Sequence, residues 1–191
     1  MIKTGLLFGS FNPIHIGHIA IASYMKEFES MQEIWFIVSP QNPFKQRKNL
    51  ASPSARLNMV RIATANFDSI IASDIEFDMP LPSYTLDTMK KLGMDFPERV
   101  FHIITGTDNL NSIYKWKGGR TLVRECNFMF YPRPNTDNEG LRLFNNARIV
   151  DAPVMEISSS FIRKSLHEGK NMRAFVPSGI YEYIIKNRLY Q

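Results

Sequence analysis

The stretch GLLFGSFNPIHIGHIAIASYM, residues 5–25, joins an apolar, strand-like segment to a segment with helical spacing. Between the two lie turn-forming and ionisable residues, among them Gly9, Ser10, Pro13, His15 and His18. A structural turn needs at most one glycine and one capping residue, so this stretch carries more polar groups than a connector requires. In open α/β sheets, ligands bind at the carboxyl ends of strands, beside the helix that follows. The stretch therefore predicts a ligand site.

The residue types in this stretch suit a phosphate group. Gly9 lets the backbone approach a ligand with no Cβ in the way, and a helix start offers unpaired N–H groups to an anion. His15 and His18 are three positions apart, so on a first helical turn they face the same way and can both donate hydrogen bonds to phosphate oxygens, and an adjacent anion favours their charged form. A structural role or a metal-binding pair stays open at this point, although no third ligand follows with convincing spacing.

Strand-like and helix-like segments alternate along the chain. Short apolar segments rich in β-branched and aromatic residues predict strands at Lys3–Phe8, Glu33–Val38, Ile70–Phe77, Arg99–Thr105, Asn127–Tyr131 and Arg148–Ala152. Helical spacing and capping residues predict helices at Ile16–Phe28, Pro53–Asn66, Ser83–Leu92, Gly119–Arg124, Ser158–His167 and Pro177–Arg188. The spacing in the first of these helices places one apolar stripe at Ile16, Ala20, Tyr24 and Phe28. The alternation predicts an α/β fold with a doubly wound, mostly parallel sheet.

Length and charge bound the possible functions. A chain of 191 residues suits one domain, residues 1–191, with a helical C-terminal part from about residue 153 to 191. The net charge of +5 is compatible with small anionic substrates or with nucleic acid, but the aromatic-rich basic strand of an RNA-recognition sheet is absent. No apolar run approaches the ~18 residues that span a bilayer, and the N-terminus does not resemble a secretory signal. With one cysteine, Cys126, these features favour a cytoplasmic protein.

The His-x-Gly-His sequence that ends at His18, with its small-residue turn, resembles the signature of the nucleotidyltransferase superfamily of adenylyl- and cytidylyltransferases. Further stretches resemble, in order and spacing, segments of the nicotinate mononucleotide adenylyltransferases. They are PSYTLDTMK at 82–90, ITGTDNL at 104–110 with Trp116 after it, YPRPN at 131–135 and ISSSFIRKSL at 157–166. The resemblance covers nearly the whole chain and implies a Rossmann-like nucleotidyltransferase fold.

The resemblance also implies roles for individual residues. The positive groups expected to act on the reacting phosphates are His15, His18, Lys45 and Arg163. The residues expected to line the ATP site are Gly9, Ser10, Phe11, His15, His18, Gly106, Asp108, Arg133, Ser158, Ser159 and Arg163. Those expected to bind the mononucleotide are Lys45, Tyr84, Thr85 and Trp116. Three serines at a helix start, with Arg163 in the next turn, form a suitable phosphate cradle on their own chemistry as well.

This sequence departs from the family pattern at two places. Phe44, directly before Lys45, stands where many relatives have a histidine, so any role of that histidine is expected to be absent or moved. Met79 and Leu81 stand where relatives often have an arginine and a glycine, so the loop before PSYT is expected to pack differently.

The implied reaction transfers the adenylyl group of ATP to nicotinate mononucleotide, giving nicotinate adenine dinucleotide and pyrophosphate, a late step of NAD biosynthesis. The attacking phosphate oxygen is already ionised, so no general base is needed. Mg²⁺ is expected to arrive with ATP, with no protein metal site. The alternatives are an adenylyltransferase for nicotinamide mononucleotide or phosphopantetheine, and a noncatalytic nucleotide- or RNA-binding protein. We expect small-molecule partners, no nucleic acid and no membrane, and we leave open whether the chain forms a homo-oligomer.

Overall fold

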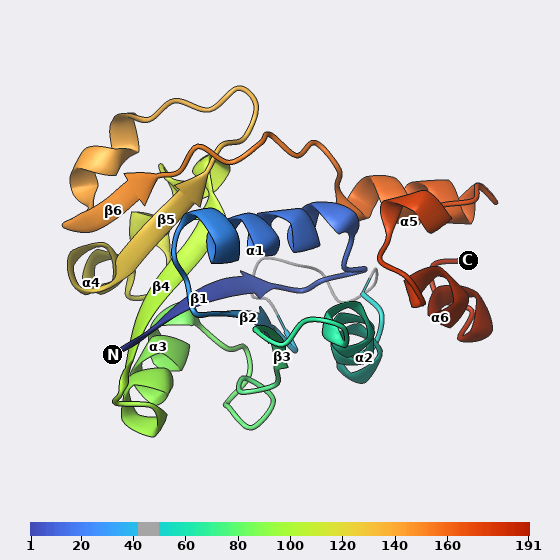
Figure 1. The fold of residues 1–191 in the computed structure, drawn as a ribbon, viewed down its shortest axis with the longest axis horizontal. Helices are drawn as coiled ribbons and strands as arrows, with labels where there is room; N and C mark the ends of the chain where they lie inside the picture. Colours follow the sequence, from blue (N-terminus) through green and yellow to red (C-terminus); the bar gives the residue numbers. More distant parts are fainter. Residues whose placement is uncertain (42–49) are drawn as a thin grey trace.

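A single sheet of parallel strands forms the centre of the computed structural model, which describes residues 1–41 and 50–191 (Figure 1). Its strands are β1 (Ile2–Gly9), β2 (Glu33–Val38), β3 (Ile70–Ser73), β4 (Arg99–Gly106), β5 (Asn127–Tyr131) and β6 (Asn146–Ile149). They are arranged in the order β3-β2-β1-β4-β5-β6, and every neighbouring pair is parallel. This is the strand order of doubly wound dinucleotide-binding sheets. The predicted fold class is therefore confirmed.

Helices cover both faces of this sheet. The α-helices are α1 (Ile16–Phe28), α2 (Pro53–Thr64), α3 (Thr85–Asp95), α4 (Gly119–Glu125), α5 (Ser159–His167) and α6 (Ile180–Lys186). In the described residues, short 3₁₀ helices lie between these elements, namely η2 (Thr107–Asn109), η3 (Ile113–Lys115), η4 (Glu139–Leu143) and η5 (Arg173–Phe175). Helices α1, α2, α5 and α6 share one hydrophobic core with the sheet, whereas α3 and α4 pack in clusters on the other face. The expectation of one domain over residues 1–191 stays a prediction.

The alternation along β2 shows how the sequence divides its apolar side chains between the two faces. Ile34, Phe36 and Val38 belong to the core under α1 and α2. Trp35 and Ile37 point the other way and pack with Leu92 of α3. Successive side chains of a strand alternate between faces, so an uninterrupted apolar run is what a strand covered on both sides requires.

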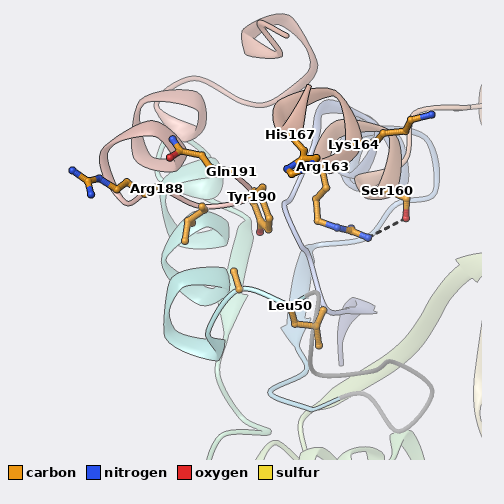
Figure 2. A pocket seen from close by; sticks show the side chains of 10 residues that line it. Leu50, Ser160, Arg163, Lys164, His167, Arg188, Tyr190 and Gln191 are labelled. Atoms are coloured by element: carbon orange, nitrogen blue, oxygen red, sulfur yellow. Dashed lines mark hydrogen bonds between the residues drawn. The ribbon is translucent and has the colours of Figure 1, made fainter. Parts of the chain in front are cut away.

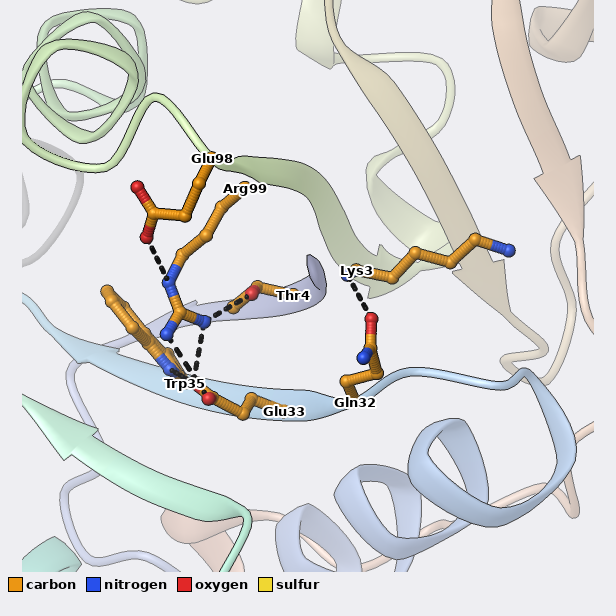
Figure 3. Close-up of polar contacts among 7 residues, drawn as sticks. All are labelled: Lys3, Thr4, Gln32, Glu33, Trp35, Glu98 and Arg99. Carbon is orange, nitrogen blue, oxygen red and sulfur yellow. Dashed lines mark hydrogen bonds and ion pairs between the residues drawn. The ribbon is translucent and has the colours of Figure 1, made fainter. Parts of the chain in front are cut away.

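Arg99 joins the amino ends of three neighbouring strands (Figure 3). Its Nη1 donates hydrogen bonds to Thr4 Oγ1 at 2.9 Å and to Glu33 Oε2 at 2.7 Å, and its Nη2 donates to Glu33 Oε1 at 3.2 Å. The guanidinium also lies 4.9 Å from the ring centroid of Trp35, whose Nε1 donates to the same carboxylate. This cluster stabilises the sheet at the edge opposite to the carboxyl ends of the strands.

Some predicted boundaries were wrong. Strand β3 ends at Ser73 rather than at Phe77, because residues 74–77 turn and place Glu76 among the hydroxyl groups of Ser39, Ser83 and Thr88. Strand β6 begins at Asn146 and ends at Ile149, two residues earlier than predicted at its start.

The apolar stripe predicted for α1 is not its buried face. The helix buries Gly17, Ile21, Ala22 and Met25, while Phe28 is 72% exposed.

Candidate active site

The loops after β1 and β4, which carry many of the predicted site residues, meet at the carboxyl edge of the sheet. Strands β1 and β4 are neighbours that end at Gly9 and Gly106, and the chain leaves them on opposite faces, toward α1 and toward η2. Ligands of doubly wound sheets bind at this point of reversal. Within residues 1–41 and 50–191, the hydroxyl group of Ser10 is buried and has no hydrogen-bond partner, as expected for a group that a ligand satisfies.

The two histidines of the first loop form a stacked pair at the start of α1. Their ring centroids lie 3.7 Å apart. The backbone N–H group of His15 donates a hydrogen bond to Nδ1 of His18 at 3.2 Å. Phe11 packs edge-on against His18, with 5.2 Å between the ring centroids. A Cβ atom on Gly17 would lie 3.1 Å from Nδ1 of His15, so the glycine makes room for the pair.

His15 is only 5% exposed, and this burial, together with the positive charge of Arg133, lowers its pKa from 6.5 to about 4. It is therefore neutral at pH 7 when no anion is bound. A neutral imidazole still donates one hydrogen bond, so His15 remains able to contact a phosphate oxygen.

Helix α5 docks its first turn onto the same loop. Ser158 caps the helix by accepting a hydrogen bond from the N–H group of Phe161 at 3.2 Å. The hydroxyl of Ser159 donates to the carbonyl of Pro13 at 2.9 Å, and Nη1 of Arg163 donates to the carbonyl of Asn12 at 2.8 Å. The first N–H groups of an α-helix have no partner within the helix. These contacts therefore bring a helix start, where N–H groups lack intrahelical partners, beside the histidine loop across about 150 residues of sequence.

A positively charged pocket of about 510 Å³ opens on the outer side of Arg163 (Figure 2). Its lining includes Lys164, His167 and Arg188, together with Tyr190. The hydroxyl of Tyr190 donates to Oδ1 of Asn12 at 2.7 Å, so the C-terminal residues also hold the first loop in place.

Arg133 and Asp108 lie on the β4 and β5 side of the histidines. Nη1 of Arg133 donates to the carbonyl of Met155 at 2.7 Å, and its Nε lies 3.9 Å from Oδ1 of Asp108. A Cβ atom on Gly106 would lie 2.9 Å from Cγ of Arg133, so a larger residue there would displace the arginine. His15, His18 and Arg133 line a common small cavity of about 20 Å³.

Three of the residues expected to bind the mononucleotide, Tyr84, Thr85 and Trp116, lie on the face of the sheet opposite to α1. Tyr84 is the residue before α3, and Thr85 is its first residue. Trp116, which follows η3, packs against the cluster that also contacts Leu86 of α3. Nζ of Lys117 lies 4.0 Å from the ring centroid of Tyr84. The structure thus places Tyr84, Thr85 and Trp116 on neighbouring elements.

Two expectations concern residues that lie outside the described part of the chain, namely Lys45 and the exchange at Phe44. Sequence reasoning also missed the fully buried Arg56 of α2, which donates to the carbonyl groups of Ser10 and Ser39 at 2.7 Å each. The sequence did carry a sign of this burial, because Arg56 lies on the face of α2 that carries apolar side chains.

The family follows from the comparison with known proteins. The model of the cytidylyltransferase-like family matches residues 6–165. The chain belongs to this family. Among curated members, the chain is 41% identical over 192 residues to the probable nicotinate-nucleotide adenylyltransferase of Flavobacterium johnsoniae, with 100% of both chains covered. It is 42% identical over 184 residues to the protein of the same name from Bacteroides fragilis, covering 96% of this chain and 92% of the relative.

Solved structures of other proteins share the fold. The nicotinic acid mononucleotide adenylyltransferase of Plasmodium falciparum, complexed with NaAD, superimposes with a TM-score of 0.86 at 24% identity, over 100% of this chain and 98% of that one. A putative nicotinate-nucleotide adenylyltransferase from Vibrio parahaemolyticus gives a TM-score of 0.71 at 17% identity, over 100% of this chain and 96% of that one.

None of the described helices has the length and apolar character that crossing a membrane requires.

Proposed function

We propose that this member of the cytidylyltransferase-like family transfers the adenylyl group of ATP to nicotinate mononucleotide, releasing pyrophosphate and forming nicotinate adenine dinucleotide. The observation that carries the proposal is the docking of α5 onto the first loop through Arg163 and Ser159, which gathers the histidines and the serine-rich helix start at one edge of the sheet. The names of the full-length relatives support the choice of acceptor.

In the proposed reaction, a phosphate oxygen of the mononucleotide attacks the α-phosphorus of ATP. A new P–O bond forms, the bond to the bridging oxygen of the β-phosphate breaks, and that oxygen leaves with pyrophosphate. No proton needs to be removed from the nucleophile, so catalysis consists of alignment and charge stabilisation. His15 and His18 are assigned to the α-phosphate region, and Arg163 with the first turn of α5 to the outer phosphates. We assign Lys45 to the same positive field, and it lies outside the described residues.

The remaining residues are assigned either to the ATP site or to the mononucleotide site. We assign Gly9, Ser10 and Phe11 to the backbone and walls of the ATP site. Gly106, Asp108, Arg133, Ser158 and Ser159 complete that site, with the exposed carboxylate of Asp108 directed to ribose hydroxyls. Tyr84 and Thr85 offer N–H groups at the start of α3 to the nicotinate carboxylate. Trp116 is assigned to stacking on the pyridine ring.

Mg²⁺ belongs to the proposal as a companion of ATP. Among the residues described, no three histidine, cysteine or acidic side chains gather as a metal site. The groups that face the site are mainly cations and hydroxyls, which fit phosphate oxygens. Bound together with ATP, Mg²⁺ would supply positive charge that offsets the charge on the leaving pyrophosphate. We place the reaction in the cytoplasm, on the grounds of the single cysteine and the metabolic substrates.

The test is incubation with ATP, Mg²⁺ and a panel of acceptors, with products identified by mass spectrometry. Nicotinate mononucleotide, nicotinamide mononucleotide, phosphopantetheine and an oligonucleotide are each supplied alone. The proposal predicts a dinucleotide and stoichiometric pyrophosphate with nicotinate mononucleotide above all others. Faster conversion of another acceptor, or no product with any of them, would contradict it.

A further inference from the structure

Two buried charged side chains have no assigned contact with a substrate, although they lie beside residues that do. Arg56 of α2 is 0% exposed, and Glu76, in the turn after β3, is 2% exposed. Neither belongs to an ion pair within the part of the chain that the structure describes. A buried charge without an opposite charge is costly unless hydrogen bonds satisfy it. The hydrogen-bond partners of Arg56 and Glu76 therefore identify the segments that these two side chains fix.

The guanidinium of Arg56 ties together three segments of backbone. Nη1 donates to the carbonyl groups of Ser10 and Ser39, both at 2.7 Å, and Nη2 donates to that of Pro40 at 2.7 Å. Nε donates to the carbonyl of Ala51 at 3.1 Å. Arg56 thus fixes the loop after β1, which carries the histidines, relative to the end of β2.

The carboxylate of Glu76 holds the start of α3 from both sides. Oε2 accepts hydrogen bonds from Ser39 Oγ at 2.9 Å and from Ser83 Oγ at 2.5 Å, and Oε1 accepts one from Thr88 Oγ1 at 2.8 Å. Ser83 lies immediately before the residues assigned to the nicotinate carboxylate, and Thr88 lies one helical turn after them. The N–H groups between these two anchors keep a fixed direction.

Ser39 connects the two systems, because its carbonyl accepts from Arg56 and its hydroxyl donates to Glu76. Arg56, Ser39 and Glu76, which we call the buried bridge, therefore run from the loop after β1 to the start of α3. We propose that the buried bridge sets the position of the acceptor subsite relative to the ATP loop, with Glu76 and Ser39 as positioning residues for the mononucleotide. This inference rests on the proposed function, in which the two loops hold the two substrates.

Kinetics distinguish such positioning from a general loss of structure. Ser39→Ala removes the hydroxyl that reaches Glu76 but keeps the carbonyl that reaches Arg56. Small displacements of a substrate-positioning group can cost up to ~100-fold in rate. We expect a KM for nicotinate mononucleotide raised about tenfold by Glu76→Gln and about fivefold by Ser39→Ala, with the KM for ATP changed less than about twofold.

The matched control is Asp74→Asn, since Asp74 is an exposed carboxylate in the same turn that pairs with Arg61 at 2.9 Å. It should leave both KM values unchanged. Because Ser39 and Glu76 share one hydrogen bond, the double variant should raise the KM by less than the product of the single effects. Circular dichroism establishes that each variant is folded. An unchanged acceptor KM in folded Glu76→Gln, or equal rises in both KM values, would overturn the proposal.

Amide hydrogen exchange of the unliganded protein keeps this inference separate from the proposed function. The backbone N–H groups of Asp87 and Thr88 donate to the carbonyl of Tyr84 at 2.9 Å and 3.1 Å, and we expect these two amides to exchange at least about tenfold faster in Ser39→Ala than in Asp74→Asn. Unchanged exchange of these amides would overturn the proposed role of the buried bridge, even if the enzyme uses nicotinate mononucleotide. Conversely, faster exchange in a protein that does not adenylate this acceptor would refute the proposed function and leave the buried bridge in place.

Discussion

The burial of His15 predicts a specific loss of stability in mild acid. Its pKa is lowered from 6.5 to about 4, because a charged imidazole at that buried position would lose its hydration beside Arg133. Between these two pKa values the unfolded chain binds a proton that the folded protein does not. The free energy of unfolding therefore falls as the pH is lowered through 6.5, and the loss is complete below about pH 4.

The size of this effect follows from the shift. Each unit of pKa difference corresponds to about 1.4 kcal/mol, so the full effect is roughly 3 kcal/mol. Between pH 7 and pH 5 the His15 contribution should fall by about 2 kcal/mol. This is a large fraction of the ~5–15 kcal/mol that stabilises a typical domain.

The assay is urea unfolding at pH 7 and pH 5 for the wild type, His15→Asn and the control His167→Asn. His167 is an exposed histidine of α5. The pH difference is taken within each protein, so the cost of replacing a buried ring cancels. From pH 7 to pH 5, the free energy of unfolding of the wild type and of the control should fall by about 2 kcal/mol more than that of His15→Asn. Equal losses in all three proteins, or an NMR titration of His15 with a pKa near 6.5, would refute the reasoning.

Three further predictions concern the site and the sheet. His18→Ala should keep its fold but lose about 100- to 1000-fold in turnover, measured as pyrophosphate release, and near-normal turnover would contradict its role. Trp116→Ala should raise the KM for nicotinate mononucleotide far more than that for ATP in steady-state assays, whereas an unchanged acceptor KM would count against stacking. Glu33→Gln removes the more buried of the two carboxylates that pair with Arg99, whose side chain is 13% exposed, and should cost about 2 kcal/mol in urea unfolding. Asp95→Asn, from the more exposed pair with Lys91, should cost less than about 0.5 kcal/mol, and equal costs would show that burial adds nothing.

The element order was predictable because strands and helices of this fold carry strong local patterns. The segment Glu33–Val38 has apolar residues on both faces, which is typical of a strand covered on both sides, and its bounds were predicted correctly. The end of β3 depends on hydrogen bonds of Glu76 with distant residues, so no local signal marks it. Helix α1 carries apolar residues on two faces, and only the packing against the sheet decides which of them is buried.

The site was predictable where turn-forming residues exceed what a turn needs, as in the loop that carries His15 and His18. The contacts that assemble it were not, because Ser159 and Pro13 are separated by 146 positions. Buried charged residues are the hardest case. The position of Arg56 on the apolar face of α2 indicates burial, but the carbonyl groups that accept its hydrogen bonds come from distant segments and could not be predicted.

A crystal structure with nicotinate adenine dinucleotide bound tests the central claim most directly, because this ligand spans both substrate sites. The account predicts that the adenylyl phosphate lies against His18 and the start of α1, with the pyridine ring beside Trp116 and its carboxylate at the N–H groups of Tyr84 and Thr85. Density for the dinucleotide elsewhere, or with the pyridine remote from α3, would contradict the account.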